Sequence, residues 1–224
     1  MKHTGILALS LLMLAPIAGA QRGSDQPTAI ADLGEVPVTV DNFVRAASDI
    51  EFAKYLSLAG GVNRFTHFRA PTTVERQPTI RMNRDTLYSI AVIDVSDDAA
   101  LVLPDVDERY LSSMIVNQDH FIPAVFHGGG RHRLKRNDME TDYVLVIIRT
   151  LVDAGDPDDV AAVNALQDAM TIEAGSAAPF IPPPYDEESY EGLVAAILGL
   201  SPFVPDSTGM FGSREDIAPV KHFV

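Results

Sequence analysis

The chain has 224 residues, no cysteine and a formal net charge of −14. The acidic balance argues against binding to nucleic acid or to anionic lipid surfaces, because both are themselves negatively charged. The lack of cysteine excludes disulfides, thiolate zinc sites and cysteine nucleophiles. Hydrophobic residues make up 46% of the chain, which is typical of a globular protein with a buried core.

The first twenty residues, MKHTGILALSLLMLAPIAGA, start with a basic segment, continue with an apolar stretch and end in small residues. This order is typical of a Sec-type signal peptide. The apolar stretch, from about Ile6 to Ala18, is shorter than the roughly 20 residues of a membrane span and contains Pro16. We therefore expect residues 1–20 to be removed, leaving a periplasmic or secreted protein with no membrane span.

The remaining chain divides into two parts. Residues 21–37 show no periodicity and predict a flexible arm. Residues 38–224 contain no internal repeat and no second domain boundary, and their length suits a single β-rich domain that ends in an irregular strap.

An amphipathic helix is predicted between about residues 39 and 61, because apolar residues recur there every three to four positions. Thr39 or Asp41 can cap its start, and Gly60 and Gly61 end it. The predicted core-facing stripe consists of Phe43, Ala47, Ile50, Ala53 and Leu56.

Strand patterns dominate the next part of the chain. Strands are expected near residues 64–70, 78–82, 86–95, 100–103, 109–117 and 143–149. Both faces of 86–95 and of 143–149 are mainly apolar, so we expect these two strands to be covered on both sides. Residues 127–142 are polar and rich in glycine and predict a long irregular loop.

The C-terminal third predicts two helices. Asp156 offers a cap and Pro157 a first helical position for one helix, whose apolar stripe is Val160, Val163, Leu166 and Met170. Residues 177–188 should be extended, because three successive prolines cannot join a helix. A shorter helix is expected over residues 188–200, followed by a strap whose aromatic side chains pack over the body.

The polar start of the strand at 86–95 is the most informative local feature. Arg81, Asn83, Arg84 and Asp85 precede it, and in an extended chain Arg84 and Tyr88 point to the same side. Burial of a lone charge is costly, so each charge needs a partner. Either these charges pair with one another and fasten the strand, or Arg84 and Tyr88 bind an anionic or carbonyl group of a ligand in a cleft.

Two other groups of residues leave their own alternatives open. Arginines cluster in an acid-poor stretch, which favours either a small-anion site or surface ion pairs. Neutral histidines next to a carboxylate can hold zinc, but their spacing matches no ligand signature such as H-E-x-x-H, so we predict no metal site. The arginines are Arg64, Arg69, Arg76, Arg81 and Arg84, and the histidines are His67, His120, His127 and His132.

Sequence motifs from 83 to 222 support a family resemblance. NRDTLYSIAVIDVS, LPDVDERY, DYVLVIIRTLVD, DDVAAVNALQDAM and DSTGMFGSREDIAPVKH occur in an order that resembles bacterial domain-of-unknown-function family 1254. The resemblance spans about Val38 to His222. It implies an α+β protein with an antiparallel β-sandwich or jelly-roll-like core, an N-terminal helix and two C-terminal helices, but no agreed activity.

The same resemblance bears on partners and on the site. Similar proteins often continue into a second β-rich domain, family 1214, whereas this chain stops at Val224. We therefore expect a short form that keeps its own site, pairs as a homodimer or works with a partner protein carrying the companion domain. The candidate ligand-binding residues are Arg81, Asn83, Arg84, Asp85, Tyr88, His67, Arg109 and Arg149.

These observations favour an exported protein that binds a small anionic or amphiphilic ligand near the start of the strand at 86–95. One alternative is a hydrolase, metal-assisted or metal-free, that uses His67 or His120 with Asp85 or Asp119. Another is an accessory partner of a protein carrying the second domain. Neither a cofactor nor a catalytic residue is identified, because the chain has no G-x-S-x-G, G-x-G-x-x-G or P-loop motif.

Overall fold

The structure, a computed structural model, describes residues 34–73 and 82–223. The predicted signal peptide, residues 21–33 of the predicted arm and residues 78–81 of a predicted strand lie outside these ranges. Met82, the last residue of that predicted strand, is described and belongs to no strand.

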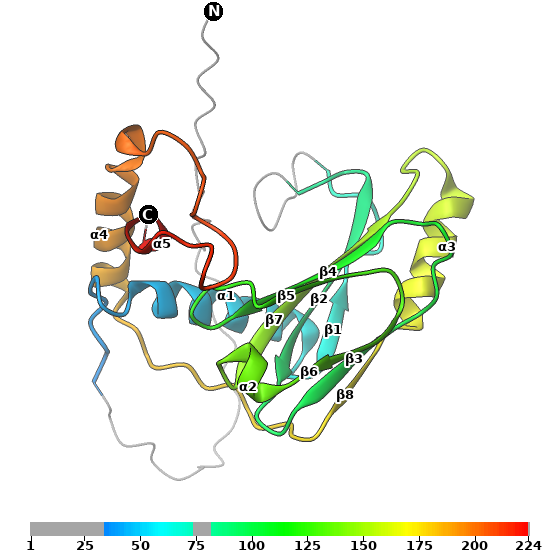
Figure 1. Cartoon of the computed structure of the whole chain (residues 1–224), viewed down its shortest axis with the longest axis horizontal. Helices are drawn as coiled ribbons and strands as arrows, with labels where there is room; N and C mark the ends of the chain where they lie inside the picture. Colours follow the sequence, from blue (N-terminus) through cyan, green and yellow to red (C-terminus); the bar gives the residue numbers. More distant parts are fainter. Residues whose placement is uncertain (1–33, 74–81, 224) are drawn as a thin grey trace, which may run out of the picture.

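Within the described residues, two antiparallel sheets form the body of the molecule (Figure 1). The larger has the strand order β1-β2-β7-β4-β5 and the smaller the order β6-β3-β8. The larger sheet contains β1 (Arg64–His67), β2 (Thr86–Asp94), β4 (Leu111–Asn117), β5 (Ala124–His127) and β7 (Tyr143–Leu151). The smaller contains β3 (Ala99–Leu103), β6 (Gly130–Leu134) and β8 (Thr171–Ala174).

Helices flank these sheets, so the predicted α+β class is confirmed. Figure 1 shows α3 at one end of the molecule and α4 and α5 at the opposite end. The helices are α1 (Phe43–Ala59), α2 (Arg136–Met139), α3 (Pro157–Asp168), α4 (Glu187–Leu198) and α5 (Pro219–Phe223), with a 3-10 turn, η1 (Ser201–Phe203), after α4. None of the described helices is both long and apolar enough to cross a membrane.

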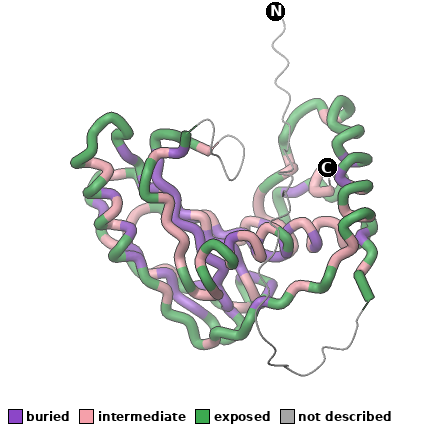
Figure 2. Tube along the Cα trace, turned by 180° about the vertical axis from the view of Figure 1, so that it is seen from behind, coloured by how far each residue is buried: buried purple, intermediate pink, exposed green. Residues whose placement is uncertain are grey.

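The core has two main parts, one on each face of the larger sheet. One face packs against the smaller sheet, where Ala91 and Ile93 of β2 contact the cluster that includes Leu101 and Leu134. On the other face, which we call the α1 face, Ile90 and Val92 pack with the helix residues Phe52 and Tyr55. All nine residues of β2 are buried, as the two apolar faces of this strand predicted (Figure 2).

The prediction of a long irregular loop at residues 127–142 is wrong, because β6 and α2 lie within this range. β6 pairs with β3 over its whole length, from Leu134 opposite Ala99 to Gly130 opposite Leu103. Only Leu134 of its five residues is buried, so the strand has almost no hydrophobic pattern of its own. Pairing with a distant strand, rather than local sequence, makes this segment extended.

Helix α1 is confirmed, but its predicted core stripe is only partly right. Ala53 and Leu56 pack against the core as predicted, whereas Ile50 is 39% exposed. The buried residues are Ala46, Ser48, Asp49, Phe52 and Tyr55. The helix is therefore rotated relative to the apolar stripe, so that two polar residues face the core. Asp49 tolerates this burial because it accepts hydrogen bonds from the side chains of Gln118 and Tyr185.

The start of α3 follows its sequence prediction. The carboxylate of Asp156 accepts a hydrogen bond from the Asp158 backbone nitrogen at 2.9 Å, and Pro157 is the first helical residue. Val163 is fully buried and packs in a cluster with Leu87 and Val152. This contact fastens α3 beside the start of β2.

The strap after α4 is attached by a few specific contacts. The Ile122 backbone nitrogen donates to the Gly212 carbonyl at 2.8 Å, and the ring of His222 stacks on Phe121 with centroids 4.6 Å apart. The rings of Phe211 and Phe223 meet those of His120 and Phe43, with centroids 6.0 and 5.9 Å apart, as expected of a strap whose aromatic side chains pack over the body. The expectation fails for Phe203, which is 81% exposed.

Candidate ligand-binding site

A row of polar side chains crosses the larger sheet on its α1 face. Tyr88 of β2 is paired with Arg149 of β7, and Arg149 is paired with Ser112 of β4. Ser112 is paired in turn with His127 of β5. Directly paired residues point to the same face of a sheet, so these four side chains, called here the Arg149 row, lie next to one another.

Arg149 is the unusual member of this row. It is half-buried on the middle strand of the sheet, yet its guanidinium forms no hydrogen bond or ion pair with any residue in 34–73 or 82–223. Its neighbours Tyr88 and Ser112 are 8% and 2% exposed. A partly desolvated guanidinium without an acceptor is unfavourable, and an anion placed over it would relieve this cost.

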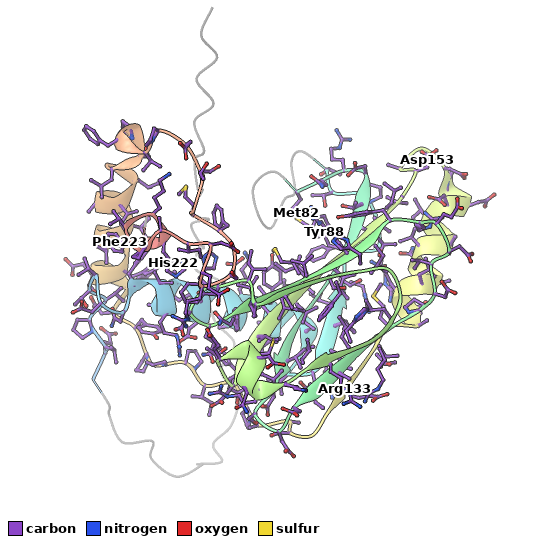
Figure 3. All side chains as sticks on the ribbon, viewed as in Figure 1. Met82, Tyr88, Arg133, Asp153, His222 and Phe223 are labelled. Atoms are coloured by element: carbon purple, nitrogen blue, oxygen red, sulfur yellow. The ribbon has the colours of Figure 1, made fainter. Side chains whose placement is uncertain are left out.

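Other polar groups lie close to Tyr88. The Tyr88 hydroxyl accepts a hydrogen bond from the Asn83 backbone nitrogen at 2.9 Å, which brings Asn83 beside the Arg149 row. Thr86 lies on the same face of β2, and its buried hydroxyl has no partner among the described residues. Figure 3 shows Met82 close to Tyr88 at this end of the sheet. The hydrogen atom of the Tyr88 hydroxyl remains free to be donated to a ligand.

An apolar row runs beside the Arg149 row on the same face. Ile147 of β7 is paired with Met114 of β4, which is paired with Val125 of β5. Ile147 and Met114 are half-buried, and Val125 is 49% exposed. A cation and a strip of accessible hydrocarbon therefore lie next to each other.

Arg84 and Asp85 lie just before β2 and are both exposed. They line an open hollow of about 420 Å³ together with Val152, Asp153 and Ala154. The Asp85 backbone carbonyl accepts a hydrogen bond from the Val152 nitrogen at 2.9 Å, but neither side chain bonds to a described residue. The structure thus places Arg84 near the end of the Arg149 row without joining it to that row by a bond.

Arg109 is engaged elsewhere. Its guanidinium donates to the Asp159 carboxylate at 3.0 and 2.5 Å and to the Leu151 carbonyl at 2.8 Å. The bonds from Arg109, together with one from the Asp153 backbone nitrogen, lower the pKa of Asp159 to about 2. This ion pair fastens the segment before β4 to α3, and Arg109 is not part of the Arg149 row.

His67 points to the opposite face from Tyr88. It is paired with Ser89, and its Nδ1 shares a hydrogen bond of 2.8 Å with the Ser89 hydroxyl. Burial and the nearby Arg69 lower the pKa of His67 to about 4, so its ring is neutral at pH 7. Ser89 is 1% exposed, which hides its hydroxyl from a substrate in solvent.

The remaining candidates do not gather at this site. Arg81 lies outside the described residues. The side chain of Asp119 forms an ion pair with Arg45 at 2.5 Å. Burial, together with the nearby His222, lowers the pKa of His120. Across residues 34–73 and 82–223, no group of three or more His, Cys, Asp or Glu side chains is arranged to hold a metal ion.

Ser112 and His127 were not among the predicted ligand-binding residues. Side chains alternate between the two faces along β4, so the local sequence indicates which residues of this strand share a face with Ser112. That Ser112 lies beside Arg149 depends on the register between β4 and β7, which no local pattern shows.

Comparison with known protein families gives one match. Residues 62–132 match the profile of the family described as "Protein of unknown function (DUF1254)". This part of the chain is therefore similar to that family. The family resemblance is thereby confirmed over residues 62–132, a range that includes Tyr88 and Ser112 but not Arg149.

Comparison with solved structures finds one protein of similar fold and one weaker match. The VPA0106 protein from Vibrio parahaemolyticus has a TM-score of 0.53 and 15% sequence identity, over 80% of this chain and 63% of that protein. A putative uncharacterized protein from Burkholderia cenocepacia has a TM-score of 0.37 and 17% identity, over 74% of this chain and 47% of the other. The chain thus spans less than two thirds of the length of either protein. Comparison with curated protein sequences finds no match.

Proposed function

We propose that this protein is exported and binds a small amphiphilic anion on its α1 face. The anionic group binds at the Arg149 row, and the hydrocarbon part lies on Ile147, Met114 and Val125. The observation that carries the proposal is the half-buried guanidinium of Arg149, which has no acceptor among the described residues.

The chemistry of the row suits a carboxylate or a phosphate. A guanidinium presents two parallel N–H donors that match two oxygens of such a group. The hydroxyls of Tyr88 and Ser112, on either side of Arg149, can each donate one more hydrogen bond. The net charge of −14 makes the rest of the chain repel anions, so binding depends on this local cation.

The export part of the proposal rests on the sequence of residues 1–20, which lie outside the described structure. We expect the protein recovered from the periplasm or the medium to begin at Gln21. N-terminal sequencing measures this directly. A full-length protein that stays in the cytoplasm would contradict export but not ligand binding.

Substitution of Arg149 by alanine tests the binding site. Octanoate and octyl phosphate are suitable probes, and octyl glucoside is an uncharged amphiphile for comparison. We expect Arg149→Ala to weaken binding of both anions about tenfold or more, because hydrogen bonds to a charged group contribute about 1.5–3 kcal/mol. Isothermal titration calorimetry on the mature protein measures the change.

The matched control is Arg133→Ala, which also removes one positive charge. Arg133 is an exposed residue of β6 in the other sheet, its side chain forms no hydrogen bond or ion pair with a described residue, and it lies away from Tyr88 in Figure 3. We expect its affinity for both anions to equal that of the wild type. An equal loss of affinity in the two variants would mean that only the net charge matters. Unchanged affinity in Arg149→Ala would contradict the proposed site.

A further inference from the structure

A second cavity lies at the other end of the α1 face. It has a volume of about 390 Å³, is open to solvent on one side, and is lined by α1, Gln118, Asp142, the start of β7 and the extended segment 179–185. Tyr143, which lines it, is six residues before Arg149 on β7, a separation of about 20 Å at ~3.3 Å per residue. The cavity is therefore separate from the Arg149 row, and what it binds does not depend on the function proposed above.

A buried carboxylate forms part of the cavity wall. Asp49 is 3% exposed, and its two oxygens accept hydrogen bonds of 2.9 Å from Gln118 Nε2 and from the Tyr185 hydroxyl. Both donors are uncharged. Burial and the bond to Asp49 raise the pKa of Tyr185, which keeps this phenol protonated.

The nearest arginine does not neutralise Asp49 by direct pairing. Arg45, one helical turn earlier, also lines the cavity, but its guanidinium bonds to Asp119 at 2.5 Å. Asp49 forms no ion pair with any described residue. A carboxylate offers about four acceptor positions and only two are filled, so Asp49 can accept further donors from the cavity side.

Aromatic side chains form the rest of the binding surface. Tyr143 and Phe180 meet edge to face with ring centroids 5.0 Å apart, and Tyr185 lines the same cavity. The Tyr143 hydroxyl bonds to the Ala178 and Pro179 carbonyls, which holds its ring in place. Aromatic rings attract cations through their negative faces, most strongly where water is excluded.

We propose that this cavity binds a small organic cation, with its ammonium group against Asp49 and its methyl or methylene groups against the rings of Tyr143, Phe180 and Tyr185. The volume lies within the usual range for pockets that hold small molecules. Of the charged lining residues, Arg45 is paired with Asp119 and Asp142 with Arg136, so the negative charge that favours a cation is that of Asp49.

Calorimetric titration with choline and with tetramethylammonium, at an ionic strength held constant with sodium chloride, tests the proposal. We expect the wild type to bind both, and Asp49→Asn to lower the affinity about tenfold or more, because the substitution keeps the shape and removes the charge. Unchanged binding by Asp49→Asn would overturn the proposal, as would a wild type that binds neither cation at millimolar concentration.

Asp107→Asn is the matched control. Asp107 is exposed between β3 and β4, its side chain forms no hydrogen bond or ion pair with a described residue, and asparagine tolerates its positive φ of 49°. This variant removes the same charge and is expected to bind both cations like the wild type. An equal loss in Asp107→Asn would assign the effect to overall charge and overturn the site.

Two further variants test cation binding in this cavity if Asp49→Asn does not fold. Tyr185→Phe keeps the ring and removes one neutral donor from Asp49, so its affinity should equal or exceed that of the wild type. Phe180→Leu keeps the apolar volume and removes a ring, so its affinity should fall several-fold. Loss of binding in Tyr185→Phe, or unchanged binding in Phe180→Leu, would contradict the proposed contacts.

Discussion

Replacing Phe52 with alanine is expected to lower the free energy of unfolding by about 3–5 kcal/mol, the usual cost of deleting a fully buried aromatic ring. Phe52 is 1% exposed and lies in the core of the α1 face with Ile90, Val92 and Leu145. Its ring also meets that of Phe180 at 6.0 Å. The substitution removes contacts that join α1 to the larger sheet, and the surrounding backbone can close the resulting space only in part.

Urea denaturation followed by circular dichroism measures this loss. Leu58→Ala is the control, because Leu58 belongs to the same helix but is 55% exposed. We expect its free energy of unfolding to stay within about 0.5 kcal/mol of the wild type. Similar losses in the two variants would mean that α1 does not pack on the sheet through Phe52.

Asp94→Asn is expected to destabilise the protein by about 3 kcal/mol at neutral pH. Asp94 is fully buried at the end of β2 and accepts hydrogen bonds from the Ser96 nitrogen at 3.0 Å, the Ser96 hydroxyl at 2.6 Å and the Ala178 nitrogen at 2.7 Å. In asparagine, an NH2 group replaces one carboxylate oxygen, so a hydrogen-bond donor would face the Ser96 or Ala178 donor that this oxygen now accepts from. The loss should therefore exceed that of an ordinary neutral hydrogen bond.

The effect of Asp94→Asn should also depend on pH. Burial alone would raise the pKa of Asp94, but hydrogen bonds from Ser96, Ser176 and Ala178 outweigh it and hold the pKa below its ordinary value. A carboxyl whose pKa is lower in the folded state stabilises the fold above its unfolded pKa of about 4. This stabilisation is lost as the pH falls from about 4 through the folded value.

We therefore expect the wild type and Asp94→Asn to converge in stability on acidification, as measured by urea denaturation at a series of pH values. Asp97→Asn is the control, since Asp97 is an exposed residue of the following turn. Its stability should stay close to that of the wild type at every pH. A difference between the wild type and Asp94→Asn that does not change with pH would show that the charge of Asp94 is not involved.

Several elements could be predicted from local sequence because local sequence is sufficient to form them. The apolar faces of β2 and β7 predict strands covered on both sides, and the two strands lie side by side within the larger sheet. Asp156 and Pro157 mark the start of α3, since capping and a fixed φ act within one helical turn. The local pattern likewise predicts Tyr88 as a ligand-binding residue, because it lies on the same side of an extended chain as Arg84.

The candidate sites depended on contacts that local patterns do not encode. Only the family resemblance predicts a role for Arg149, and only the register between β2, β7 and β4 places it between Tyr88 and Ser112. A shift of one residue would move its side chain to the opposite face. The site is therefore a property of strand pairing.

The sequence alone thus determined the long strands and the start of α3, because periodicity and capping are local, and the family resemblance implied the α+β class. Tertiary structure decided which polar groups are buried. Asp49 faces the core, against the predicted stripe of α1, because its partners Gln118 and Tyr185 lie 69 and 136 residues further along the chain. A buried carboxylate is tolerated only where such donors converge, and their convergence follows from the packing of the whole fold.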